Sequence, residues 1–215
     1  MKSRATQTKE LDMVNGPLAR KILIYSIPLM FSNLLQVFFN MTDVAVVGKF
    51  AGARALGSVG STTIIITLTT GILLGMGGGV NAVTALHMGA EDYQRVHKTV
   101  HTSVILCFIA GLLLLVTGLA FSKPLLEVMN TKPELIDGAV LYFRIYAFGM
   151  PAMAVYNFGN AVMSASGDTK KPLIYLTFAG IVNVCLNLIF VIGIGMAEDG
   201  VAFASITAQY ISAIL

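Results

Sequence analysis

The feature that most constrains this chain is a set of long apolar runs. The residues from Val100 to Phe121, for example, include no aspartate, glutamate, lysine or arginine. A helix needs about 20 mostly apolar residues to cross the hydrocarbon core of a bilayer, and runs of this length exceed what a buried core helix needs. Only 12% of the chain is charged, whereas soluble domains contain about 25% charged residues. We therefore predict an integral membrane protein.

Six such runs predict the fold class: an all-α, polytopic membrane protein built as a bundle of six transmembrane helices. Short polar stretches rich in glycine, proline and charged residues separate the runs. The predicted spans are Ile22–Val47, Leu56–Thr84, Val100–Phe121, Val140–Ser164, Pro172–Ile194 and Val201–Leu215. Pro151 predicts a kink in the fourth span, and the polar stretch Ser122–Gly138 is expected to hold a short amphipathic helix at the membrane surface.

The chain divides into a polar tail, residues 1–21, and the six-helix unit, residues 22–215. Most lysines and arginines lie in this tail and in the second and fourth loops. The positive-inside rule therefore predicts a cytoplasmic N-terminus. The sixth run stops at Leu215 without a charged tail. We expect a chain truncated within its sixth helix, whose other half lies elsewhere.

One acidic residue, Asp43, is predicted to lie inside a span. A charge at the bilayer centre costs at least about 2.5–3.5 kcal/mol, so such a residue is a functional-site hypothesis. Asn33, Gln36 and Asn40 precede Asp43 at spacings of three, four and three. At helical periodicity the four residues fall within an arc of roughly 80°. This polar stripe predicts a helix that faces a water-filled cavity, although interhelical hydrogen bonding by the amides is the alternative.

Polar side chains on three other spans are predicted to face the same cavity. Those on the fifth and sixth spans lie at a depth similar to that of Asp43, and those on the fourth lie deeper toward the cytoplasm. The set comprises Asn183 and Asn187 on the fifth span, Ser205 and Gln209 on the sixth, and Asn157 and Asn160 on the fourth. Pro28 removes a backbone hydrogen bond from the first span and predicts a kink there, either static or a hinge.

Other site classes are not expected. The chain has no Ser/His/Asp order, no HExxH sequence and no paired carboxylates on one helix, so an enzyme is not predicted. His97 and His101 lack a nearby third ligand, and no metal site is predicted beyond sodium at Asp43. Cys107 and Cys185 lie in apolar runs and suggest no disulfide. The net charge of +3, without a basic stripe, argues against a nucleic-acid partner.

Several stretches together resemble the multidrug and toxic compound extrusion (MATE) transporters. The similarity runs from Leu18 to Leu215, and "TDVAVVG" followed by "GDTKKP" is its most specific part. The remaining matches are "LARKILIYSIPLMFSNLLQVFFNMTDVAVVGKF", "SASGDTKKPL", "NVCLNLIF" and "GVAFASITAQ". Members of that family have twelve helices in two lobes, so the resemblance implies an N-terminal six-helix lobe.

The resemblance also implies a function. It points to a secondary active antiporter that exports organic, often cationic, compounds in exchange for protons or sodium ions. The expected partners are these small compounds, the lipid bilayer, and a C-terminal lobe or a second copy of the chain. No cofactor is expected other than the coupling ion, and the expected location is the cell membrane, as in a bacterial inner membrane.

Residue roles follow from the resemblance by position. Asp43 matches the coupling acid of the first helix, Asn183 matches an amide near it, and Ser205 stands where threonine is common. Gln36, Asn157 and Asn160 match residues that line the cavity, to which the stripe adds Asn40. Pro28 matches a proline proposed to bend the first helix when the acid is protonated. Asn187 departs from the pattern, because one branch of the family carries aspartate there.

Two other functions compete with antiport. A lipid-linked sugar flippase from a related branch would be expected to carry more basic residues in its cavity, where only Arg144 is a candidate. A membrane scaffold that transports nothing would be expected to have uniformly apolar helix faces, which the stripe from Asn33 to Asp43 contradicts.

Overall fold

The computed structural model describes residues 18–215, and this part of the chain is helical with short connections and no strand. The elements are α1 (Leu18–Val46), the π-helical turn η1 (Val47–Ala51), α2 (Gly52–Gly89), α3 (Tyr93–Val128), α4 (Pro133–Ala147), α5 (Met150–Ala165), α6 (Lys170–Leu188), the π-helical turn η2 (Ile189–Gly193) and α7 (Glu198–Ile214). The predicted all-α class is therefore confirmed. Most of the predicted N-terminal tail lies outside the described residues.

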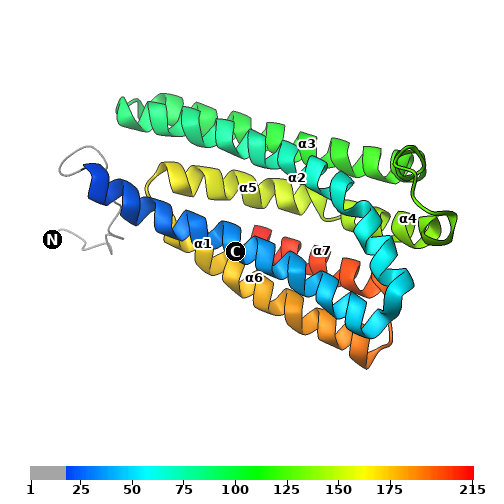
Figure 1. The fold of residues 1–215 in the computed structure, drawn as a ribbon. Coiled ribbons are helices and arrows are strands. Elements are labelled where there is room, and N and C mark those ends of the chain that lie inside the picture. The colour runs from blue at the N-terminus through cyan, green and yellow to red at the C-terminus, as the bar shows by residue number, and fades with distance from the viewer. Residues whose placement is uncertain (1–17) are drawn as a thin grey trace.

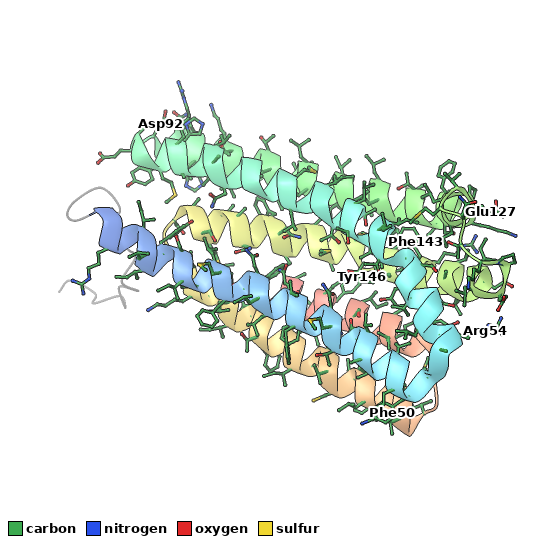
Figure 2. All side chains as sticks on the ribbon, viewed as in Figure 1. Phe50, Arg54, Asp92, Glu127, Phe143 and Tyr146 are labelled. Atoms are coloured by element: carbon green, nitrogen blue, oxygen red, sulfur yellow. The ribbon has the colours of Figure 1, made fainter. Side chains whose placement is uncertain are left out.

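The helices form two groups that face each other across the cavity described below. In Figure 1, α1, α6 and α7 lie side by side, and α2, α3 and α5 form the second group. Helix α7 also packs against α4 and α5, which joins the two groups. The chain runs back and forth, so its connections gather at two opposite ends. Figure 2 shows Arg54 and Glu127 at one end and Asp92 at the other.

The helices have the length and composition of membrane spans. Within the described residues, Ile22–Gly89, Tyr93–Val128 and Lys170–Gly193 are each long and apolar enough to cross a bilayer. The first of these stretches reverses direction around η1 and so accounts for two crossings (Figure 1). Helices α4 and α5 together make a fourth candidate span. With 17 residues, α7 is at the short end of the roughly 17–25 residues that a spanning helix requires.

The fourth predicted span, Val140–Ser164, is wrong as a single helix, because α4 and α5 meet there at a bend of 47°. The kink predicted from Pro151 lies at this break. Proline has no N–H, so the carbonyl of Ala147 loses its usual helical partner. The hydroxyl of Tyr210 on α7 donates to the carbonyl oxygen of Phe148 at 3.0 Å. The break is therefore held against α7 rather than left to solvent or lipid.

The amphipathic surface helix predicted within Ser122–Gly138 is also wrong. The first part of this stretch continues α3 through Pro124, and the last part begins α4. The physical reason is burial: Leu126 is fully buried and packs with Ile65 and Phe143 in a small apolar cluster. Tertiary packing therefore extends α3 beyond the length that the apolar run alone predicts.

The "GDTKKP" stretch forms the connection from α5 to α6. Asp168 accepts a hydrogen bond from the backbone N–H of Lys171 and lies 2.8 Å from its ammonium group. Partial burial alone would raise the pKa of Asp168, but the hydrogen bonds and positive charge of Lys171 outweigh it and lower that pKa. Pro172 lies in the first turn of α6, as predicted. Asp168 is thus ionised at neutral pH and fixes the start of α6.

Helices α3 and α5 approach each other closely at a glycine, Gly111. A Cβ atom placed on Gly111 would lie 2.8 Å from the Cα of Pro151 and 2.9 Å from the Cβ of Ala154. Both neighbours are rigid, so even a methyl group must push the helices apart. Small residues at such crossings are how membrane helices pack without a hydrophobic driving force.

We expect Gly111→Ala to destabilise the bundle by about 1–3 kcal/mol, because it overpacks this crossing. Thermal unfolding in detergent micelles measures the effect. The matched control is Gly75→Ala on α2, where the added Cβ would meet nothing within 4 Å. Equal melting temperatures for the two variants would contradict the assigned contact.

Candidate functional site

A cavity of about 570 Å³, here called the main cavity, lies between the two helix groups. The polar stripe of α1 forms one wall of it, so the structure places Asn33, Gln36, Asn40 and Asp43 where the stripe predicted them. Polar residues of α6 and α7, helices of the same group as α1, line the cavity as well, although Asn187, which was predicted to face it, does not. Those that line it are Asn183, Ser205, Gln209 and Ser212.

Asp43 is the centre of the polar contacts in this cavity. Its side chain is held between three helices, and only 8% of the residue is exposed. The side-chain amide of Asn187 on α6 donates to Oδ1 of Asp43. The hydroxyl of Ser205 on α7 donates to Oδ2 at 3.0 Å. The structure therefore brings together two sequence-predicted partners, far apart in the chain, on one carboxylate.

The partners of Asp43 also contact each other. The amide nitrogen of Asn187 lies 3.2 Å from Oδ1 of Asn183, and the amide of Asn183 donates to Oγ of Ser205 at 3.4 Å. Asn187 is fully buried behind the cavity wall, and its own Oδ1 has no hydrogen-bond partner among the described residues. Carboxylate, amide and hydroxyl oxygens are the ligand types that hard cations prefer. The cluster therefore has the chemistry to hold a proton or a sodium ion.

Among the residues that the structure describes, no basic side chain is found to balance the charge of Asp43. None of the described residues that line the main cavity is lysine or arginine. The salt bridges found among the described residues, Arg95–Asp92 and Lys171–Asp168, lie at the helix ends. A buried carboxylate without a counter-charge is costly unless it takes up a proton or a cation. The arrangement can thus exchange one positive species for another.

Tyrosines form an aromatic wall that sequence reasoning missed. Tyr142 and Tyr146 on α4 stack with ring centroids 6.2 Å apart, and both line the main cavity with Tyr156. Tyr146 lies in the interior between the helix groups (Figure 2). The i,i+4 spacing of Tyr142 and Tyr146 was the signal available in the sequence, but aromatic residues that only pack a helix against its neighbours show the same spacing. Aromatic faces attract cations, most strongly where water is excluded.

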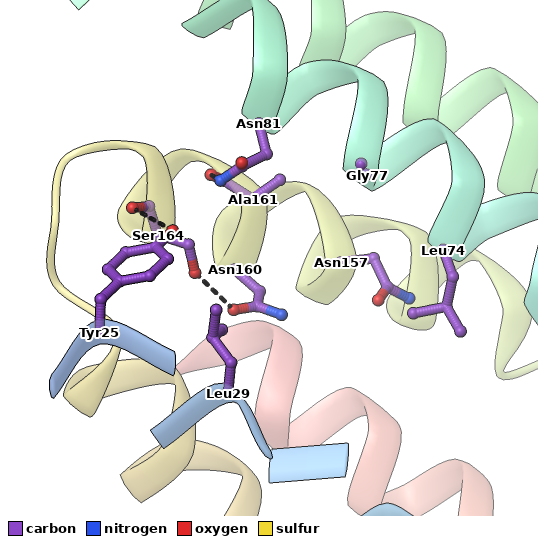
Figure 3. A pocket seen from close by; sticks show the side chains of 10 residues that line it. Tyr25, Leu29, Leu74, Gly77, Asn81, Asn157, Asn160, Ala161 and Ser164 are labelled. Carbon is purple, nitrogen blue, oxygen red and sulfur yellow. Dashed lines mark hydrogen bonds between the residues drawn. The ribbon is translucent and has the colours of Figure 1, made fainter. Parts of the chain in front are cut away.

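Asn157 and Asn160, which were predicted to share the cavity with Asp43, lie instead in an adjoining pocket of about 180 Å³. This inner pocket is shown in Figure 3, where α1 contributes Tyr25 and α2 contributes Asn81. The hydroxyl of Tyr25 donates to the carbonyl of Ser164, and the amide of Asn81 donates to the carbonyl of Ala161, each at 2.9 Å. The lining combines amides and hydroxyls with apolar residues such as Leu29 and Leu74, and its described residues carry no charge.

The predicted hinge residue, Pro28, lies within a continuous α1. The hydroxyl of Ser32 donates to the carbonyl oxygen of Pro28 at 3.0 Å. A hydroxyl that bonds back to the preceding turn often accompanies helix bending. The position thus combines two features that weaken the helix, and its role as a hinge stays a prediction.

Comparison with known proteins agrees with the arrangement of helices and cavity. Residues 28–189 match the family model MatE, which covers most of the chain. The chain belongs to the MatE family. Its members are transporters rather than enzymes, and its members in solved structures are polytopic membrane proteins.

Individual relatives support the same assignment. The chain is 28% identical over 204 residues to a probable multidrug resistance protein, YpnP, of Bacillus subtilis, covering 95% of this chain and 46% of the relative. It is 25% identical over 186 residues to a protein named FAD transporter from Shewanella oneidensis, covering 85% of this chain and 40% of that protein. A crystal structure of a MATE protein in the bent conformation superimposes with a TM-score of 0.90 at 25% identity, covering 96% of this chain and 46% of that one. The chain thus spans about half the length of the relatives it matches.

We expect Asn187→Leu to lower the free energy of unfolding by about 1–3 kcal/mol, because it leaves the buried carboxylate of Asp43 without one of its donors. Thermal unfolding in detergent at neutral pH measures the loss. Asn40→Leu is the matched control, since Asn40 is exposed on the same cavity and no hydrogen bond is found for it. A loss of equal size in both variants would contradict the role assigned to Asn187.

Proposed function

We propose that this chain is one lobe of an antiporter that exports organic cations in exchange for protons or sodium ions, with Asp43 as the coupling site. The observation that carries the proposal is the buried carboxylate of Asp43, which has neutral donors but no basic partner among the described residues. Such a group must be neutralised from outside the protein, by a proton or by a cation.

The exchange follows from competition for this one carboxylate. An organic cation in the main cavity is stabilised when Asp43 is charged and loses that stabilisation when a proton or sodium ion neutralises it. Each species lowers the affinity for the other by the same factor, because coupling between two binding events is reciprocal. An inward gradient of the small ion would then drive the organic cation out.

The cavity also favours a class of substrate. The charge of the main cavity comes from Asp43. Tyr142 and Tyr146 offer aromatic surface, and Met153 offers flexible apolar surface. The FAD transporter is named for a compound with a negatively charged pyrophosphate. That chemistry calls for arginine or lysine, which the described lining lacks. The same absence argues against a lipid-linked sugar flippase, because Arg144 bonds to Ser122 and does not line the cavity.

The other half of the transporter and the direction of transport belong to the proposal as well. Alternating access requires two repeats that move against each other. A C-terminal lobe, or a second copy of this chain, would supply the second repeat. The basic tail and the two connections at the same end as the start of α1 would face the cytoplasm of a bacterial inner membrane.

We expect Asp43→Asn to reduce ethidium efflux driven by an ion gradient to less than about a tenth of the efflux of the unaltered protein. A tenfold loss corresponds to only about 1.4 kcal/mol of lost interaction energy. The assay uses membrane vesicles that contain the native protein, either unaltered or with this one substitution. Vesicles are loaded with ethidium, and efflux is recorded after a proton or a sodium gradient is imposed. Asp137→Asn, the same change on an exposed carboxylate of α4, should leave efflux unchanged.

Retention of efflux in Asp43→Asn would overturn the coupling role. Which of the two gradients drives efflux in the unaltered protein identifies the coupling ion. If neither gradient drives efflux of ethidium, antiport of organic cations is refuted, and a scaffold or flippase role takes its place.

A further inference from the structure

The main cavity and the inner pocket share one lining side chain. Leu74, on α2, is the only described residue that lines both. It is 45% exposed although it faces the interior of the helix arrangement, so its surface is available to whatever fills the two spaces. In Figure 3 it lies beside Asn157 at the edge of the inner pocket.

Between Gly71 and Gly78, Leu74 is the only α2 residue with a side chain that lines either space. Gly71 lines the main cavity, and Gly77 and Gly78 line the inner pocket. A Cβ atom at Gly71, Gly75 or Gly78 would meet nothing within 4 Å. Leu74 is therefore the one bulky group that this part of α2 places between the two spaces.

The two spaces differ in chemistry. The main cavity contains the carboxylate of Asp43, whereas the inner pocket offers the amides of Asn81, Asn157 and Asn160 and no charged group. A ligand that occupies both must have a cationic end and, at a fixed distance from it, a neutral end that forms hydrogen bonds. Its neutral end must also pass Leu74.

We propose that Leu74 is a specificity-determining residue that divides a two-part ligand site and selects cations by the length and bulk of a neutral, hydrogen-bonding extension. The inference rests on the proposed function, because it takes the cationic end to lie near Asp43. A compact cation lies near Asp43 in the main cavity and does not extend past Leu74. An extended cation places its neutral end in the inner pocket and does.

The test compares two cations that differ only in their extension. The compact probe is benzyltrimethylammonium, and the extended probe is the same cation with a four-carbon chain on the ring that ends in a primary amide. Equilibrium dialysis against the protein in lipid nanodiscs gives the dissociation constant of each. The readout is the ratio of the two constants, so a general loss of folded protein does not change it.

We expect Leu74→Phe to weaken binding of the extended probe about tenfold while the compact probe stays within about twofold, because a larger side chain narrows the passage. Leu74→Ala should shift the ratio in the opposite direction by widening it. The matched controls are Leu68→Phe and Leu68→Ala, since Leu68 is an exposed leucine of the same helix that lines neither space. They should leave the ratio unchanged.

The outcomes separate this inference from the function on which it rests. If Asp43→Asn weakens binding of both probes but neither Leu74 variant changes the ratio, the division of the site by Leu74 (here called the partition) is refuted and the cation site stands. If Asp43→Asn changes neither probe, or if neither probe binds, the cation site is refuted and the partition with it. Equal shifts in the Leu68 variants would also overturn the partition.

Discussion

The arrangement of the site depends on one buried carboxylate, Asp43, for which the described residues supply no basic partner. Asp43 is held by an amide from α6 and a hydroxyl from α7, while its own helix, α1, forms the wall of a cavity without lysine or arginine among its described lining. Neutral donors orient a carboxylate but leave its charge to be balanced by a mobile species. On the proposed function, the contacts that position Asp43 are therefore also those that would make the site respond to ions.

Asn187 makes this site simpler than the resemblance to MATE transporters would imply. Where one branch of the family carries a second acid, this chain has an amide that cannot ionise. Its nitrogen serves Asp43 and Asn183, and its oxygen is buried without a partner. A single carboxylate can accept one proton or one monovalent cation at a time. Competition at this lobe is therefore between single charges.

The sequence was sufficient for the fold class, the stripe on α1 and the two residues that donate to Asp43, because helical periodicity and depth in the membrane determine which side chains share a level. Pro151 predicted a kink, but the sequence was insufficient for the full break between α4 and α5 and for the extension of α3 past Pro124, because packing against α7 and around Leu126 decides them. The sequence also predicted a single cavity, where the structure has the main cavity and the inner pocket. Asn157 and Asn160 line a different pocket from Asp43, and Leu74, which lines both, has an apolar side chain that carries no such signal in the sequence.

The most direct test of the central claim is the count of small ions released when an organic cation binds. The purified protein is titrated with benzyltrimethylammonium in weakly buffered solution between about pH 5 and 8, first without and then with sodium, while released protons and sodium are measured. The account predicts about one proton or one sodium ion released per cation bound, and no release in Asp43→Asn. Binding of the cation to the unaltered protein without release of either ion would contradict it.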